Sequence, residues 1–162
     1  MARSLILFPT SVCDSRCLHC FYYEAVDAPK NRTRLLPADT RKLAVAMGRI
    51  KDLSLSGGEP ILRHDLEALL EPILRIGRPR SITLPTGGLH AARVERAARF
   101  ILRMLPETHL TISLSFDGPP EAHDRIRGVP GAYPKQRRRT ICSPTSRSPV
   151  FSISSSSRRC AR

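Results

Sequence analysis

Short apolar runs alternate with helix-like segments along most of the chain, and this alternation constrains the fold more than any other feature. The strand-like runs are Ser4–Phe8, Asp52–Ser56, Arg80–Leu84 and Leu110–Ser115. The helix-like segments, with apolar residues at helical spacing, are Pro37–Gly48, Asp65–Ile76 and Ala91–Leu105. Repeated strand–helix units are typical of a parallel α/β sheet or barrel. Pro72 lies inside the second segment and is expected to kink or shorten that helix.

The unusual residues of the chain fall directly after these strands. They are Cys13, Cys17 and Cys20 after the first strand, Gly57-Gly58-Glu59-Pro60 after the second, Thr86-Gly87-Gly88 after the third and Asp117-Gly118 after the fourth. In parallel α/β folds the loops at the carboxyl ends of the strands share one edge and carry the chemistry. The sequence therefore predicts one site, at that edge of the sheet.

The cysteines form a C-x3-C-x2-C run. Three thiolates at this spacing can hold three irons of a 4Fe–4S cluster and leave the fourth iron open for reaction. The alternative is a structural zinc site, which usually needs four protein ligands, and His19 would be a fourth only with awkward local geometry. Because five clustered cysteines do not suggest a disulfide framework, we expect reduced thiols and a cytoplasmic protein.

The Gly57-Gly58-Glu59 sequence combines backbone freedom with a carboxylate. Glycine adopts conformations closed to other residues and lets a ligand approach the backbone closely. A carboxylate at such a place suits a positively charged ligand group, because the contact is charge-assisted. The alternative is an ordinary tight turn between a strand and a loop.

The net charge of +13 raises the question of nucleic-acid binding. Residues 1–135 contain 20 of the 27 Lys and Arg and all 14 acidic residues, so about half of the excess lies in the last 27 residues. No compact basic face with interleaved aromatic residues is present, so nucleic-acid binding is disfavoured. The four apolar residues before Pro9 are too few for a signal peptide or a membrane span.

From residue 136 the chain becomes rich in Ser, Arg and Pro, with no acidic residue. Such a composition predicts disorder for residues 136–162. We hypothesise that this tail is translated out of frame, because the body is Arg-rich and Lys-poor, as in a GC-rich coding sequence. The alternative is a genuine solvated basic tail. Cys142 and Cys160 lie in this tail and are interpreted as incidental.

Three ordered motifs resemble those of the radical S-adenosylmethionine (radical SAM) enzymes. They are Cys13-Asp-Ser-Arg-Cys17-Leu-His-Cys20, Gly57-Gly58-Glu59-Pro60, and Ser115-Phe-Asp117-Gly118 with His123-Asp124-Arg125-Ile126-Arg127-Gly128. The resemblance covers about residues 4–135 and implies a partial (β/α) barrel of about four strand–helix units. Because this core usually has six such units, a truncated core with an exposed sheet edge is expected.

The resemblance also implies cofactors and roles for particular residues. Cys13, Cys17 and Cys20 would bind a 4Fe–4S cluster. S-Adenosylmethionine (SAM) would be bound by Gly57, Gly58 and Glu59, with Ser115 near its ribose and Arg127 near its carboxylate. Thr86 would also serve, although the family commonly has Thr-Asn-Gly where this chain has Thr86-Gly87-Gly88. Asp117 is interpreted as a turn-former, and His123 with Asp124 as ordering the loop after the fourth strand.

The implied reaction is reductive cleavage of SAM to a 5′-deoxyadenosyl radical, with electrons from flavodoxin or ferredoxin. The third motif resembles the peptide- and protein-modifying branch, which includes the sulfatase-maturing enzymes, so a peptide or protein substrate is expected. Two other functions stay open on the sequence alone. One is an iron–sulfur electron-transfer module without SAM chemistry, and the other is a basic interaction protein that acts through its tail.

Overall fold

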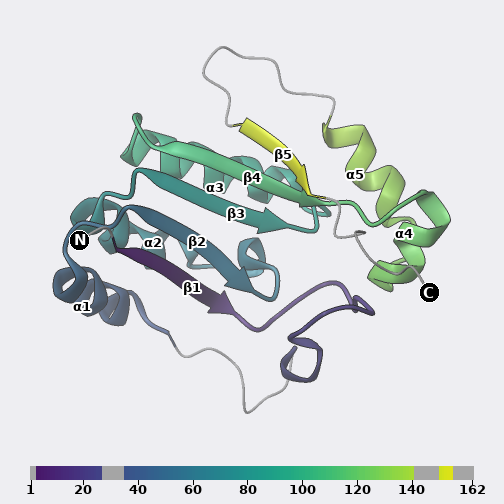
Figure 1. The fold of residues 1–162 in the computed structure, drawn as a ribbon, viewed down its shortest axis with the longest axis horizontal. Helices are drawn as coiled ribbons and strands as arrows, with labels where there is room; N and C mark the ends of the chain where they lie inside the picture. Colours follow the sequence, from purple (N-terminus) through teal and green to yellow (C-terminus); the bar gives the residue numbers. More distant parts are fainter. Residues whose placement is uncertain (1–2, 27–34, 141–149, 155–162) are drawn as a thin grey trace.

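Five parallel strands form a single sheet in the order β1-β2-β3-β4-β5 (Figure 1). The computed structural model describes residues 3–26, 35–140 and 150–154. The strands are β1 (Ser4–Thr10), β2 (Asp52–Gly57), β3 (Ser81–Thr86), β4 (His109–Ser115) and β5 (Val150–Ser154). The α-helices are α1 (Pro37–Met47), α2 (Leu66–Pro72), α3 (Ala91–Met104), α4 (Pro120–Arg127) and α5 (Ala132–Thr140). The shorter helical turns are η1 (Tyr23–Ala25), η3 (Pro60–Leu62) and η4 (Ile73–Gly77).

Helices α1, α2 and α3 lie on one face of the sheet, whereas α4 and α5 lie beside the carboxyl ends of β4 and β5 (Figure 1). Each crossover between parallel neighbours contains at least one helix, as parallel pairing requires. The predicted α/β fold with a parallel sheet is therefore confirmed, and the carboxyl ends of the strands meet at one edge.

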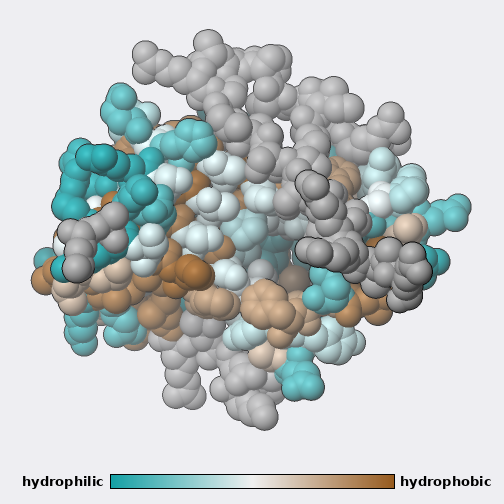
Figure 2. Space-filling model, in the orientation of Figure 1, coloured by the Kyte–Doolittle hydropathy of each residue, from teal (hydrophilic) through white to brown (hydrophobic). Residues whose placement is uncertain are grey.

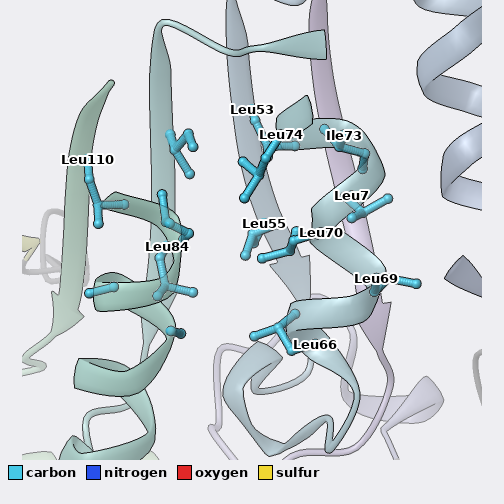
Figure 3. Packing of buried hydrophobic residues seen from close by; sticks show 14 of the residues in the cluster. Leu7, Leu53, Leu55, Leu66, Leu69, Leu70, Ile73, Leu74, Leu84 and Leu110 are labelled. Atoms are coloured by element: carbon cyan, nitrogen blue, oxygen red, sulfur yellow. The ribbon is translucent and has the colours of Figure 1, made fainter. Parts of the chain in front are cut away.

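The core lies between the sheet and the helices. Alternate strand residues point to this side, and Leu53, Leu55, Ile82, Leu84 and Ile112 are all almost fully buried there. Figure 3 shows leucines of α2 packing against Leu residues of β1 and β2. This packing explains the period-two pattern of the strands and the helical spacing of the segments between them.

The opposite face of the sheet is built mainly from small hydroxyl residues. Ser54, Thr83, Thr111 and Ser113 are half-buried and alternate with the core residues. In Figure 2 the middle of this face is pale, whereas the side near β1 is brown. In β1, Ile6 is 64% exposed. Residues that alternate with a buried leucine thus create a second, polar surface.

Pro72 shortens its helix as predicted. Helix α2 ends at Pro72, and the chain continues through one π-helical turn, η4, to Gly77. Proline cannot donate the backbone hydrogen bond of a regular helix, so a change of hydrogen-bond pattern at this point is expected.

Two regions differ from the sequence-based expectations. The segment after β4 is interpreted as a loop on the sequence alone, but it forms α4 and α5, and the predicted boundary at residue 136 falls inside α5. Strand β5 lies within the segment for which disorder was predicted, and it pairs with residues 111–115 of β4. The edge of β4 that was expected to be exposed is therefore paired. Residues 141–149 and 155–162, with Cys142 and Cys160, lie outside the described residues.

The reason for these differences is local. Phe151 and Ile153 alternate with serines, which is a strand pattern too short to be distinctive in a Ser-rich tail. In α4 and α5, low apolar content hides the helical spacing, since most of their residues are polar or charged.

Candidate active site

Buried polar side chains gather at the carboxyl edge of the sheet. Of the described residues, nine polar or charged ones are buried, and only Thr40 lies elsewhere, in α1. The other eight lie at the strand ends, in the loops that follow, or in α4 and α5: Ser11, Ser15, Glu59, Thr86, Asp117, His123, Arg127 and Gln136. Because buried polar groups are costly unless they are paired, this concentration marks the edge as the candidate site.

Glu59 is a buried carboxylate of this edge, with 4% of its surface exposed, as is Asp117. Its Oε2 accepts hydrogen bonds from Thr86 Oγ1 at 3.0 Å and from the Gly87 N–H at 2.6 Å. Its Oε1 is buried and has no hydrogen-bond partner among the described residues. Burial raises the pKa of Glu59 to about 7, although the hydrogen bonds from Gly87 and Thr86 oppose that rise. The Ile61 backbone N–H also lies near enough to the carboxylate to lower its pKa, but Oε1 lacks a well-formed hydrogen bond among the described residues and can accept one.

Gly57 and Gly58 let the loop after β1 pass close to β2. This loop, residues 11–22, is called the cysteine loop below. A Cβ on Gly57 would lie 2.5 Å from Thr10 O, and a Cβ on Gly58 would lie 2.2 Å from Val12 O. The N–H groups of Gly58 and Glu59 donate to these same two carbonyls, at 2.9 and 2.8 Å. The close approach predicted for a ligand is therefore made here by the chain's own backbone.

The three predicted metal ligands lie on the cysteine loop as free thiols. Cys17 is buried, and Cys13 and Cys20 are half-buried. Burial raises the pKa of Cys13 to about 11, and burial also raises that of Cys17. Cys17 interacts electrostatically with each of the other two thiols.

This loop does not present a finished metal site. Within residues 3–26, 35–140 and 150–154, no three His, Cys, Asp or Glu side chains are arranged to hold a metal ion. This applies to the zinc alternative with His19 as much as to a cluster. The donor set of three thiols on one loop fits an iron–sulfur cluster chemically, and ligation would require these side chains to turn toward a common centre.

Helix α4 holds the cysteine loop through its last turn. The N–H groups of Arg16 and Leu18 donate to the carbonyls of Arg127 and Ile126, both at 2.9 Å. Gly128 follows the helix with φ +64°, and a Cβ there would lie 2.9 Å from Arg16 O. A glycine is therefore required at this contact, both for its left-handed conformation and for space.

Arg127 is the last residue of α4, and its guanidinium is buried between a carboxylate and a thiol. Its Nε lies 2.5 Å from Asp117 Oδ2, and its Nη1 donates to Cys17 Sγ at 3.4 Å. Arg127 was predicted to lie in a loop, and Asp117 was interpreted as a turn-former. The structure shows that the two residues form a buried ion pair, which holds the guanidinium against a predicted cluster ligand.

His123 and Asp124 order the segment after β4, as the sequence predicted. His123 Nδ1 accepts a hydrogen bond from the Asp117 N–H at 3.2 Å, and its ring lies 5.7 Å from those of Phe116 and Tyr133. Desolvation lowers the pKa of His123, which favours the neutral ring. The carboxylate of Asp124 accepts the N–H groups of Gly131 and Tyr133, at 2.6 and 2.8 Å, and so fixes the start of α5.

The remaining predicted residues occupy different parts of the edge. Thr86 ends β3 and is hydrogen-bonded to Glu59, so these two predicted residues are brought together. Ser115 ends β4 and is half-buried, and among the described residues it makes no side-chain hydrogen bond to Glu59 or Arg127. Tyr22, two residues after Cys20, packs between Phe8 and Phe21.

Two contacts of the site were missed by sequence reasoning. Gln136 of α5 is 2% exposed and donates from Nε2 to Gly87 O. Asp14 pairs with His90, whose Nε2 lies 3.0 Å from Asp14 Oδ2, and so links the cysteine loop to the start of α3. Gln136 belongs to no local motif, and the cysteine motif that contains Asp14 does not indicate a pairing with His90, because each contact joins segments far apart in the sequence.

The family model described as the Radical SAM superfamily matches residues 7–141. The chain is 33% identical over 127 residues to the pre-heme d1 synthase of Dinoroseobacter shibae, which covers 76% of this chain and 29% of that protein. It is 35% identical over 82 residues to the GTP 3′,8-cyclase of Pelotomaculum thermopropionicum, a match that covers 49% of this chain and 25% of that protein. The chain therefore spans less than a third of these curated relatives.

Solved structures with the same fold include anSMEcpe with bound AdoMet, at a TM-score of 0.65 and 21% identity, over 94% of this chain and 42% of that chain. They also include Streptococcus suis SuiB bound to S-adenosylmethionine, at a TM-score of 0.53 and 20% identity. That match covers 80% of this chain and 28% of the SuiB chain. At these identities the likeness supports the fold alone. In the described part of the chain, no helix has the length and hydropathy to span a bilayer. The family match over residues 7–141 and the parallel α/β sheet show that this chain belongs to the radical SAM superfamily.

Proposed function

We propose that this chain forms the cluster-binding part of an enzyme that cleaves S-adenosylmethionine reductively. The observation that carries the proposal is Glu59, a buried carboxylate beside the cysteine loop whose Oε1 has no hydrogen-bond partner among the described residues. A buried acceptor of this kind is stable only if a ligand or water supplies a donor. The amino group of SAM's methionine part is such a donor, and as an ammonium it would form a charge-assisted hydrogen bond.

Cys13, Cys17 and Cys20 would hold the 4Fe–4S cluster, at one side of Glu59. When bound, the cluster would supply the electron that breaks a sulfonium C–S bond of SAM, giving methionine and a 5′-deoxyadenosyl radical. The chain's own contribution is to orient SAM and to exclude water. The N–H of Glu59 donates to Val12 O, at 2.8 Å, directly before Cys13. This contact fixes the spacing between the ligand-binding carboxylate and the first thiol.

The other predicted cofactor-binding residues surround this pair. Gly57 and Gly58 bring the cysteine loop against β2, and Thr86 orients Glu59 through its hydroxyl. Ser115 would contact the ribose. Arg127 would contact the carboxylate of SAM through the part of its guanidinium that does not face Asp117 or Cys17.

We infer that the substrate is a peptide or protein. The support is the resemblance of the Ser115 to Gly128 segment to the peptide-modifying branch, together with the fold of two peptide-binding neighbours. Their structures are described as anSMEcpe with bound AdoMet and Cp18Cys peptide, and SuiB bound to precursor peptide SuiA. The small hydroxyl residues of the opposite face of the sheet, Ser54, Thr83, Thr111 and Ser113, would suit a polypeptide backbone. A flavodoxin or ferredoxin would be the reductant.

The test is anaerobic reconstitution of the cluster, followed by dithionite and SAM and by measurement of 5′-deoxyadenosine. The expected result is 5′-deoxyadenosine formation that Glu59→Gln reduces strongly and Cys17→Ala abolishes. Val45→Ala is the matched control, because Val45 is 65% exposed on α1, away from the site. A stable four-iron cluster whose spectrum does not change with SAM would overturn the proposal and favour electron transfer alone.

The substrate inference has its own test. The reconstituted chain is incubated with SAM and a panel of peptides containing Cys or Ser, and in parallel with GTP. Peptide modification, or peptide-stimulated 5′-deoxyadenosine, would support the inference. Stimulation by GTP alone would overturn it.

A further inference from the structure

The orientation of Glu59 depends on the loop formed by Thr86, Gly87 and Gly88, called the Gly87 loop below. Thr86 Oγ1 and the Gly87 N–H both donate to Oε2 of Glu59. The other oxygen, Oε1, is thereby left buried and without a hydrogen-bond partner among the described residues. A rotation of the Gly87 backbone would remove one of the two hydrogen bonds and release the carboxylate from this orientation.

The Gly87 loop has one internal hydrogen bond, in which the Gly88 N–H donates to Thr86 Oγ1 at 3.0 Å, but its own residues give it no further support. Two consecutive glycines have more backbone freedom than any other residue pair, and Gly88 already has φ +75°. Neither glycine has a side chain that could pack or form a hydrogen bond. A contact from another part of the chain would therefore restrict the Gly87 backbone further and keep its N–H directed toward Glu59.

Helix α5 makes that contact. Gln136 Nε2 donates to Gly87 O, so Gly87 is held from one side by Gln136 and from the other by Glu59. The fit is close, because a Cβ on Gly88 would lie 3.3 Å from Gln136 Cγ and 2.9 Å from Leu114 Cδ2. Gln136 is 2% exposed, so water does not compete for the amide.

Helix α5 is in turn fixed to the rest of the site. Asp124 of α4 accepts the N–H groups of Gly131 and Tyr133 at the start of α5. The last turn of α4 forms backbone hydrogen bonds with the cysteine loop. The α4–α5 pair thus contacts both loops of the candidate site, the cysteine loop through α4 and the Gly87 loop through α5.

We propose that Gln136 is a positioning residue for ligand binding, which acts through Gly87 to orient Glu59 toward an α-amino group. The ligand part of this inference rests on the proposed function. Gln136 lies at the residue where the tail composition begins. It is nevertheless a component of the site, because its amide supplies a side-chain hydrogen bond that the Gly-Gly loop cannot make for itself.

The decisive variant is Gln136→Met, which keeps the side-chain length and removes the donor. Lys135→Ala is the matched control, because Lys135 is the neighbouring residue of α5 and is exposed. SAM affinity is measured with the cluster-reconstituted chain. We expect Gln136→Met to weaken SAM binding roughly three- to ten-fold, as for loss of one hydrogen bond, and Lys135→Ala to leave it unchanged.

A double-mutant cycle separates positioning from a general structural role. If Gln136 acts through Glu59, Gln136→Met should have little further effect on SAM affinity in a Glu59→Gln background. Fully additive losses would overturn the proposal, as would an unchanged affinity in the single variant. Thermal unfolding of each variant checks that the fold is retained.

A second measurement does not depend on SAM. In the iron-free chain, the amide proton of Gly87 should resonate downfield, because it donates to a carboxylate at 2.6 Å. Gln136→Met should move this resonance upfield, and Lys135→Ala should not. An unmoved Gly87 resonance would overturn the positioning role. A resonance that moves in a chain that fails to bind SAM would instead overturn the proposed function and leave the positioning of Glu59 standing.

Discussion

The helix-covered face of the sheet and its carboxyl edge are stabilised in different ways. The face is an apolar cluster with many equivalent contacts, in which leucines and isoleucines of the strands meet those of α2 and α3. The edge has few apolar contacts and depends on individual hydrogen bonds and one buried ion pair, Asp117–Arg127. The face therefore tolerates exchanges between apolar residues of similar volume, whereas the edge requires particular residues.

The largest expected loss of stability follows from removing one partner of the Asp117–Arg127 ion pair. Asp117→Asn should lower the free energy of unfolding by about 3–5 kcal/mol, because the buried Arg127 loses its charged partner. Urea unfolding measures this. The double variant Asp117→Asn with Arg127→Met should recover much of the loss, since no unpaired charge stays buried. A single variant as stable as the parent would mean that the edge does not depend on this pair.

The second effect removes one apolar contact from the face. Leu70→Ala should lower the free energy of unfolding by about 2–5 kcal/mol, because Leu70 is 1% exposed and a cavity would remain. Val45→Ala serves as the control and should change it by less than about 0.5 kcal/mol, since Val45 is 65% exposed. Unlike the edge variants, Leu70→Met should hardly change the free energy of unfolding, because it nearly conserves volume. A large loss of stability in that variant would show that the face also requires particular residues.

A third effect appears as a pH dependence of the edge. Burial raises the pKa of Glu59 from 4.5 to about 7, so between these values the folded chain binds a proton that the unfolded chain releases. The contribution of Glu59 to stability is therefore fully present below about pH 4.5 and is lost as pH rises through about 7. Its size is on the order of 3 kcal/mol.

Glu59→Gln isolates this contribution. Urea unfolding of the iron-free chain at a series of pH values, with and without the substitution, gives the difference that belongs to Glu59. We expect the difference to favour the variant increasingly from pH 4.5 to 7. A difference that does not vary with pH would mean that Glu59 titrates normally.

The smallest effect is expected at the surface of the helices. Glu71 pairs with Arg75 and Glu95 with Arg99, each four residues apart and well exposed. Arg75→Ala or Arg99→Ala should change the free energy of unfolding by about 0.5 kcal/mol or less, because solvent and salt screen these pairs. A loss above about 1 kcal/mol at high salt would show that charges outside the edge also determine stability.

Sequence reasoning reached the fold through periodicity. The strands up to β4 and the helices up to α3 lie close to their predicted ranges, because each buries an apolar face of regular period. Helices α4 and α5 were missed, since they are stabilised at their ends and by polar contacts such as Asp124 with Tyr133. The pairing of β5 with β4 was missed because five residues of a Ser-rich tail contain too short a pattern.

The site divides in the same way. The three cysteines, Gly57-Gly58 and Glu59 stand in compact motifs, whose residue types and spacing alone predict a chemistry. The sequence by itself therefore determined the parallel α/β class and the edge at which the site is proposed, and the resemblance to a known family added the residues proposed for the cofactors. Periodicity and local motifs can be recognised in the sequence, because each involves only a few neighbouring residues.

Only the tertiary structure decided how those residues are held. Arg127 reaches Cys17 across 110 positions of sequence, and Gln136 reaches Gly87 across 49. Contacts of this kind leave no local pattern in the sequence. An Arg or a Gln at position 127 or 136 would fit any ordinary helix. Their geometry depends on where α4 and α5 lie against the sheet, and that placement follows from packing the whole chain.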